Sequence, residues 1–183
     1  YFAKIASQEL GVNVVAVSSS KKTLTSVAGF DFSNVDFSRK AIDDLEDQAD
    51  SEGSSEQIIS EEVDVLVCAA LENTITKSNY DTVNAKFILE LANGPVSFQA
   101  YQKLIKNGVI DIPDIIANAG GVTVSYYEWL QNMQGKKWSL AKVNQELEKK
   151  LSSATKNALD YSKQSSISLK QAAFEIAISR LAS

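Results

Sequence analysis

Histidine is absent from this sequence. Its absence excludes Ser-His-Asp and Cys-His nucleophilic catalysis, histidine-ligated zinc and a pH switch based on histidine. Cysteine is limited to Cys68, so the chain can form neither an internal disulfide nor a metal site of four cysteines. No base stands beside Cys68 in the sequence, and we interpret it as a small core residue rather than a nucleophile. We expect no metal site, and the lack of a disulfide allows a reducing compartment.

Long apolar runs and a surplus of positive charge are missing as well. No apolar run approaches the ~18 residues that a membrane-spanning helix needs, so we expect no membrane partner. The 18 Lys and Arg residues are outnumbered by 23 Asp and Glu residues, for a formal net charge of −5, which argues against nucleic acid as a partner. The chain starts at Tyr1, with neither an initiator Met nor the apolar core of a signal peptide. We therefore expect a cytoplasmic protein, and a chain that is a piece of a longer one.

What is present is an ordinary globular composition, with 183 residues of which 44% are apolar and 22% charged. A chain of this length forms one domain, or two at most. Helical spacing of apolar residues predicts helices over 2–10, 76–83, 98–107, 119–133, 140–158 and 169–181. We expect Gly11 to end the first of them, Ser97, Ser139 and Ser168 to cap the helices that follow them, and Phe98 and Leu104 to face inward. Short apolar runs predict buried strands over 12–17, 63–67, 86–90 and 109–112. Residues 18–26 are predicted to be a loop, and the acidic segment 36–60 a solvated helix and loop without a function.

Strands that alternate with helices predict an α/β fold, a doubly wound parallel sheet of the Rossmann type with both faces covered. No G-x-G-x-x-G motif occurs, so the glycine-rich phosphate-binding turn of such a fold is not visible. Lys21 and Lys22 follow the first predicted strand, at the place where dinucleotide-binding folds contact the adenosine ribose. No acidic residue lies beside them in the sequence. They form either a site for a 2′-phosphate or a solvated loop.

Three loops follow predicted strands, and each carries an asparagine among small residues: Asn73, Asn93 and Asn118. In open parallel sheets, ligands bind at the carboxyl ends of the strands. An Asn side chain offers a donor and an acceptor, which suits an amide or a ribose hydroxyl. The alternative is that these residues only form turns, which Asn and Gly favour.

Asn118, Val122 and Ser125 stand at i, i+4 and i+7, on one stripe of the predicted helix. The start of a helix attracts anions such as a substrate carboxylate. The pair Gly120-Gly121 costs about 1 kcal/mol per residue inside a helix, which suggests close approach of a ligand or of backbone. Alternatively, Asn118 caps the helix and Ser125 bonds back to its own backbone.

Several motifs resemble those of one known family. They are AALENTIT over 69–76, ANGP over 92–95, PDIIANAGGVTVSYYEW over 113–129, QN over 131–132 and LKQAA over 169–173. In order and spacing they are similar to the cofactor-binding domain of the glutamate, leucine, phenylalanine and valine dehydrogenases, and residues 123–129 favour glutamate dehydrogenase. Residues 1–183 would then be a truncated NAD(P)-binding domain that lacks its first strand and glycine-rich turn.

The resemblance implies an NAD- or NADP-dependent enzyme that interconverts L-glutamate with 2-oxoglutarate and ammonia, and that forms a homo-oligomer, a hexamer in the family. It implies cofactor contacts at Ser19, Ala69, Ala70, Asn93 and Asn118, with Ser19 standing where many members carry Asp. The implied substrate contacts are Asn118, Val122 as a pocket wall and Ser125 as the partner of the substrate's side-chain carboxylate.

The chain departs from the family pattern at Cys68, usually Pro, at Leu91, usually Gly, and at 96–98, usually Thr-Thr-Pro. The family's catalytic lysine and aspartate lie in a substrate domain that would precede Tyr1, so no catalytic residue is assigned here. We expect the parent protein to be an enzyme, this chain alone to be inactive, and the helix over 168–182 to pack partly on that domain. The alternatives are a non-catalytic Rossmann-like binding module, or a piece of a branched-chain or aromatic amino-acid dehydrogenase.

Overall fold

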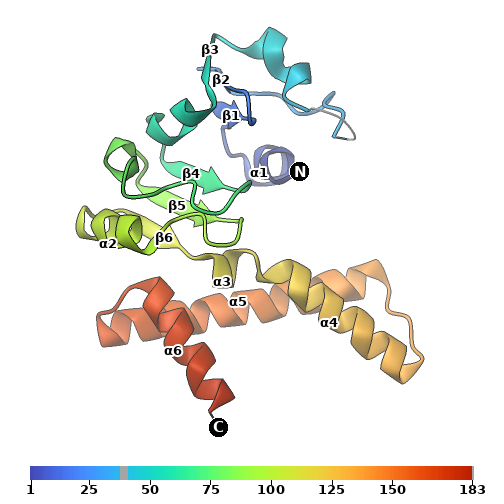
Figure 1. Cartoon of the computed structure of the whole chain (residues 1–183). Coiled ribbons are helices and arrows are strands. Elements are labelled where there is room, and N and C mark those ends of the chain that lie inside the picture. Colours follow the sequence, from blue (N-terminus) through green and yellow to red (C-terminus); the bar gives the residue numbers. More distant parts are fainter. Residues whose placement is uncertain (38–40, 183) are drawn as a thin grey trace. The chain divides into compact units, whose positions relative to one another are not determined.

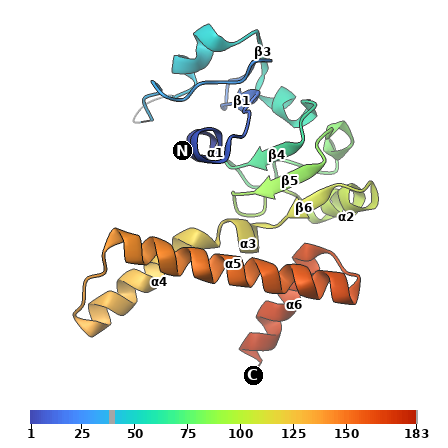
Figure 2. The same cartoon turned by 180° about the vertical axis from the view of Figure 1, so that it is seen from behind.

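The computed structural model describes residues 1–37 and 41–182, which form two compact units. The first unit comprises Tyr1–Val63 and Thr82–Ala85, and the second comprises Asp64–Asp81 and the chain from Lys86 onwards. The elements of both are labelled in Figure 1 and seen from behind in Figure 2.

The first unit opens with helix α1 (Phe2–Leu10), which ends as predicted at Gly11, a glycine with the positive φ of 66° that such a helix end favours. An antiparallel sheet follows, with strands β1 (Ala16–Ser18), β2 (Lys22–Thr25) and β3 (Ser51–Ser54) in the order β1-β2-β3. Its core gathers around Leu24, Phe30, Phe32 and Leu45.

Two predictions for this unit are wrong. The buried strand over 12–17 is reduced to the three residues of β1, which are only half-buried or exposed, and the predicted loop over 18–26 contains β2. The reason is a tight turn at Ser19, whose backbone N–H donates to the Lys22 carbonyl (2.8 Å) and whose hydroxyl accepts from the Lys21 N–H (3.2 Å). This turn folds the polar segment back as a hairpin, and the fully buried Leu24 holds β2 in place.

The acidic segment contains two 3₁₀ helices, η1 (Asp43–Gln48) and η2 (Ser55–Ser60), on either side of β3, rather than one solvated helix and a loop. Leu45 and Ile59 are buried, so this segment contributes to the core as well as to the surface. Residues 38–40 of the segment lie outside the described residues.

The second unit is built on a parallel sheet of β4 (Val65–Cys68), β5 (Phe87–Glu90) and β6 (Ile110–Ile112) in that order. The register pairs Cys68 with Glu90 and Leu89 with Ile112. These three strands confirm the parallel part of the prediction. The fold is therefore mixed α/β, with a small parallel sheet and a separate antiparallel one. Of the predicted strands, only the one over 12–17 falls outside the parallel sheet, since its remaining part, β1, pairs antiparallel with β2.

Burial along the parallel strands alternates, whereas near-continuous burial was expected. Leu66 and Cys68 are buried while Val65 is 45% exposed, so the two faces of β4 are unequally covered. Between β4 and β5, only the 3₁₀ turn η3 (Tyr80–Thr82) forms in place of the predicted helix over 76–83. The Asn79 side chain accepts from the Thr76 N–H (2.7 Å) and donates to the Thr74 carbonyl (3.0 Å), and such local bonds compete with a helix.

The helices of the second unit follow their predicted capping residues. Ser97 caps α2 (Phe98–Lys106) and Ser139 caps α5 (Leu140–Ser165), each side chain accepting a backbone N–H three residues on. Leu104 of α2 is buried as expected, but Phe98, expected inward, is 71% exposed.

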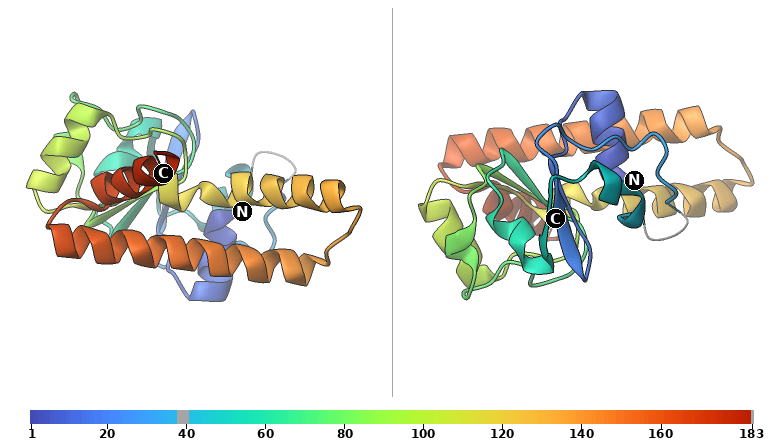
Figure 3. Two further views of the ribbon diagram at one scale, coloured as in Figure 1. Left: turned by 90° about the horizontal axis from the view of Figure 1, so that it is seen from below. Right: turned by 90° about the horizontal axis from the view of Figure 1, so that it is seen from above.

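Three further helices are α3 (Asp114–Ala117), α4 (Ala119–Gln134) and α6 (Leu169–Leu181), the last capped by Ser168. Helix α5 packs against α4 near one end and against α6 near the other (Figure 3). None of the helices in the described part of the chain is both long and apolar enough to cross a membrane.

Candidate functional site

Backbone hydrogen bonds join the loops at the carboxyl edge of the parallel sheet. The loop after β5 donates from the N–H groups of Leu91 and Ala92 to the Cys68 carbonyl, over 2.9 and 2.8 Å. In return, the Asn73 N–H donates to the Gly94 carbonyl (2.9 Å). The loop after β6 joins them through Asp114, whose Oδ2 accepts the Gly94 N–H (2.8 Å), so the three loops meet at one edge, as the topology predicted.

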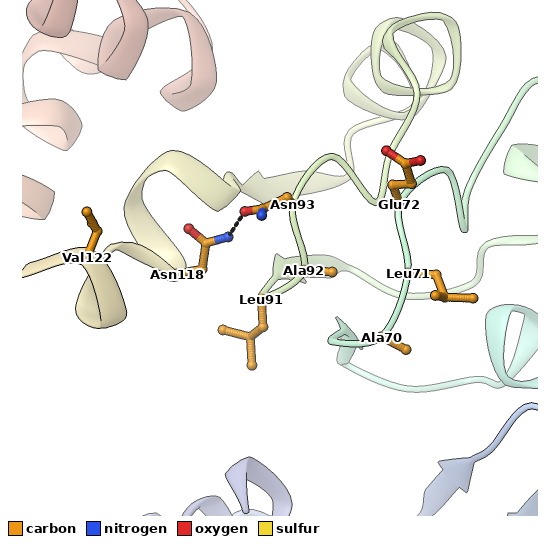
Figure 4. A pocket seen from close by; sticks show the side chains of 8 residues that line it. All are labelled: Ala70, Leu71, Glu72, Leu91, Ala92, Asn93, Asn118 and Val122. Carbon is orange, nitrogen blue, oxygen red and sulfur yellow. Dashed lines mark hydrogen bonds between the residues drawn. The ribbon is translucent and has the colours of Figure 1, made fainter. Parts of the chain in front are cut away.

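A cavity of about 750 Å³ lies at this edge (Figure 4). Its lining consists of Ala70, Leu71, Glu72, Leu91, Ala92, Asn93, Asn118 and Val122. Small and apolar side chains make up most of the wall, and the two asparagines and Glu72 supply its polar groups. Such a mixture is typical of small-molecule and cofactor sites.

Asn93 and Asn118 meet directly, since the Asn118 Nδ2 donates to the Asn93 Oδ1 over 2.6 Å (Figure 4). This bond leaves the Oδ1 of Asn118 as an acceptor and the Nδ2 of Asn93 as a donor. A planar carboxamide of a ligand presents the complementary pair of groups. The arrangement can thus orient an amide without any charged residue.

A buried ion pair lies behind these loops. Glu90, at the end of β5, is fully buried, and Lys170 of α6 places its Nζ 2.9 Å from both carboxylate oxygens. The same carboxylate accepts the backbone N–H of Asp114 (2.9 Å). Asp114 in turn accepts the Gly94 N–H through Oδ2 (2.8 Å).

Asp111 of β6 is the second buried carboxyl group in this region. It is 4% exposed, and neither of its oxygens has a hydrogen-bond partner among the described residues. Burial, reinforced by the charge of Glu90, raises the pKa of Asp111 to about 7. Tyr101 is close to this group of charges, since the Lys170 ammonium lies 5.1 Å from the centre of its ring. Burial raises the pKa of the Tyr101 phenol.

The first unit has a cavity of its own, of about 820 Å³. It is lined by Ser18, Ser19, Ser20, Lys21, Lys22, Ala41, Ile42, Asp43, Glu46 and Glu52. Lys22 forms ion pairs with Glu46 and with Glu52, and the hydrogen bond to Glu46 is the main cause that raises the pKa of Lys22. Its charge is therefore already balanced within this unit.

The sequence profile of the Glutamate/Leucine/Phenylalanine/Valine dehydrogenases matches residues 1–183. The chain belongs to this family. It is 37% identical over 183 residues to a glutamate dehydrogenase of Thermotoga maritima, covering all of this chain and 44% of the relative. An NAD-specific glutamate dehydrogenase A of Halobacterium salinarum is 38% identical over 172 residues, with 94% and 40% covered. The NADP-specific glutamate dehydrogenase of Synechocystis is 37% identical over 173 residues, with 94% and 39% covered.

Solved structures agree with this assignment. The hetero-hexameric glutamate dehydrogenase of Thermus thermophilus in a Leu-bound form matches with a TM-score of 0.84 at 25% identity, covering 97% of this chain and 42% of that one. The enzyme of Peptoniphilus asaccharolyticus is 39% identical with a TM-score of 0.59, covering 62% and 29%. The chain spans less than half the length of these relatives. The family resemblance is thus confirmed.

The predicted site residues of this family member fall into three groups. Ala70, Asn93, Asn118 and Val122 line the cavity of the second unit. Ala69 and Ser125 do not line it. Ser19 lies in the first unit, at the hairpin turn.

The structure also bears on the alternative readings of the asparagines and Ser125. The Asn118 side chain makes no capping bond to α4. Two side chains of α4 bond back to its backbone: the Thr123 hydroxyl donates to the Ala119 carbonyl (2.8 Å) and the Gln131 amide donates to the Tyr127 carbonyl (3.1 Å). Ser125 is exposed. Asn73, with a φ of 52°, is a turn residue outside the cavity. Asn93 and Asn118 also lie at a bend and a turn of the backbone, but unlike Asn73 they line the cavity.

Sequence reasoning missed Glu90, Asp111 and Lys170. A signal was available, because Glu90 and Asp111 each stand within an otherwise apolar strand run, and a buried carboxylate requires a partner or a proton. The interpretation of Cys68 is confirmed as far as burial goes, since it is 5% exposed. Burial first, then the nearby carboxylates, raises its pKa to about 12, which suppresses the thiolate.

Proposed function

We propose that this chain is the cofactor-binding part of an NAD(P)-dependent glutamate dehydrogenase, which interconverts L-glutamate with 2-oxoglutarate and ammonia. The observation that carries the proposal is the Asn93–Asn118 pair at the cavity on the carboxyl edge of the parallel sheet. Membership of the family and the glutamate-dehydrogenase relatives support it.

The donor and acceptor left by the asparagine pair suit the carboxamide of a nicotinamide ring. Ala70 and Ala92 keep that part of the cavity wide enough for a flat group, so the residues present fit the cofactor. NAD or NADP, when bound, supplies the hydride acceptor or donor. By resemblance, Ala69 and Ser19 are further cofactor contacts, each within its own unit.

The substrate contacts of the proposal are Asn118, Val122 and Ser125. Val122 lines the cavity and is 71% exposed, which makes it an apolar wall. Ser125 lies one turn further along α4 with an exposed hydroxyl, free to donate to the side-chain carboxylate of glutamate. No lysine is among the residues that line the cavity, and we expect the chain alone to be inactive.

The whole protein, in this proposal, is a cytoplasmic homo-oligomer, a hexamer as in the family; the Thermus relative is described as a hetero-hexamer. The test is the oxidation of glutamate with NAD and with NADP by the full-length protein. We expect Asn93→Ala to raise the cofactor KM by roughly tenfold, because one hydrogen bond is lost. The control is Asn144→Ala, at an exposed position on α5, which should leave the cofactor KM unchanged. The proposal fails if glutamate is not oxidised with either cofactor.

A further inference from the structure

Asp114 forms hydrogen bonds to the backbone on both sides of the asparagine pair, at Asn118 and at Gly94. Its backbone carbonyl accepts the N–H of Asn118 (3.0 Å), one helical turn further on. Its side chain crosses to the neighbouring loop, where Oδ2 accepts the N–H of Gly94 (2.8 Å), the residue that follows Asn93. One residue thus fixes the backbone at Asn118 and next to Asn93.

The loop that Asp114 holds is tightly turned. Gly94 adopts a φ of 54°, in the left-handed region. Its N–H points at the Asp114 carboxylate and its carbonyl accepts from Asn73. A hydrogen bond to a charged acceptor is about twice as strong as a neutral one, so the carboxylate is the strongest single restraint on this turn. Without it, Asn93 loses its fixed direction toward Asn118.

Asp114 is itself held by a hydrogen bond from its backbone to a buried carboxylate. The fully buried Glu90 accepts its N–H (2.9 Å), and Lys170 neutralises Glu90. Asp114 is not among the residues that line the cavity, so its side chain does not reach a ligand there. Any effect of Asp114 on the site must therefore pass through the two asparagines.

We propose that Asp114 is a positioning residue, which holds Asn93 against Asn118 so that the pair presents one donor and one acceptor to the cofactor's carboxamide. The identity of that ligand rests on the proposed function, whereas the restraint on the Gly94 turn does not. Orientation of the nicotinamide governs hydride transfer, so loss of the restraint lowers kcat and kcat/KM for the cofactor more than it raises the KM for glutamate.

The test compares Asp114→Ala, Asp114→Asn and the control Asp160→Ala in the full-length protein. Asp160 is an exposed carboxylate that pairs with Lys156 on α5. Hydrogen exchange of the peptide that contains Gly94 reports the restraint, and steady-state kinetics report its effect. We expect Asp114→Ala to exchange at least tenfold faster there and to lose 10- to 100-fold in kcat/KM for the cofactor, with the glutamate KM within threefold.

Asp114→Asn keeps a neutral carbonyl acceptor in the same place, so we expect it to restore part of both quantities, and Asp160→Ala to match the wild type. Unchanged exchange at Gly94 in Asp114→Ala overturns the proposal, as does faster exchange with an unchanged kcat/KM. Equal losses in Asp114→Asn and Asp114→Ala also overturn it. An inactive wild type with faster exchange in Asp114→Ala defeats the proposed function and leaves the restraint established.

Discussion

At the scale of single residues, the site depends on neutral hydrogen-bonding groups rather than on charges. Asn93 and Asn118 face the cavity as amides, and the nearby charged carboxylates of Glu90 and Asp114 are turned to backbone N–H groups and to Lys170. This separation leaves the cavity polar enough to orient an uncharged amide. Glu90 and Asp114 act on it only through the backbone that they hold, and Glu72 is the acidic residue among those that line it.

Ser125 is the residue whose role the proposal makes most specific. Removal of a hydrogen bond to a charged group costs about 1.5–3 kcal/mol, so Ser125→Ala in the full-length protein should lower kcat/KM for glutamate by roughly 10- to 100-fold. Selectivity should shift toward apolar amino acids such as norvaline, because the polar group that disfavours them is gone. Steady-state kinetics with both substrates measure this. An unchanged glutamate kcat/KM removes Ser125 from the substrate site.

Cys68 gives a second residue-scale prediction. With its pKa raised to about 12 and its side chain buried, the thiol is almost entirely protonated at neutral pH. We expect a disulfide reagent such as dithionitrobenzoate to modify the native chain at under a hundredth of the rate seen in denaturant. Rapid native modification at pH 7 contradicts the burial of Cys68.

At the scale of elements, α6 is anchored at its start and exposed toward its end. Ala172 and Ala173 are buried, and Lys170 reaches Glu90, whereas Ile178 and Leu181 are 61% and 89% exposed. The expectation that this helix packs partly on another domain stays a prediction. Within this unit, its first two turns are tied to the parallel sheet through the buried ion pair of Lys170 with Glu90.

Lys170→Ala should therefore destabilise the chain strongly. It leaves Glu90 as an unpaired buried charge, for which the loss is about 3–5 kcal/mol in the free energy of unfolding. The matched control is Lys156→Ala, which breaks the exposed pair with Asp160 on α5 and should cost under about 1 kcal/mol. Denaturant unfolding of both variants compares them. Similar losses in the two variants argue against a structural role for the Lys170–Glu90 pair.

The elements that the sequence predicts well are those with local signals. Ser97, Ser139 and Ser168 cap three helices as expected, because a cap involves neighbours three residues away. Strand β2 could not be found in this way, since Lys22–Thr25 has no apolar alternation and pairs with strands on both sides of it in the chain. The Asp114–Gly94 and Glu90–Lys170 bonds are likewise non-local, and only the fold reveals them.

At the scale of the whole chain, the two units differ in whether their acidic residues are exposed or buried. The described acidic residues of the first unit are largely at its surface, and Lys22 is neutralised there by Glu46 and Glu52. The second unit buries Glu90 and Asp111 with Lys170 as the adjacent cation. Two carboxyl groups next to one ammonium cannot both be balanced in their charged forms. The folded state therefore favours a proton on Asp111, which links global stability to pH.

The sign of this linkage follows from the direction of the shift. The pKa of Asp111 rises from 3.8 to about 7 on folding, so between these values the folded chain holds more protons than the unfolded one. The contribution of Asp111 to stability thus falls as the pH rises from about 4 to 7, and is constant above that range. Glu90 and Asp114 act in the same direction as burial, and Lys170 opposes them.

Asp111→Asn removes this contribution, because an amide stays neutral at every pH tested. We expect the advantage of the variant over the wild type to grow by about 1–3 kcal/mol between pH 5 and pH 8. The difference between the two proteins isolates Asp111, since the remaining carboxylates titrate equally in both. Denaturant unfolding of wild type and variant from pH 5 to pH 9 measures that difference. A difference that does not vary with pH means that Asp111 is already charged in the folded chain, and that water or Tyr101 supplies the partner its oxygens lack.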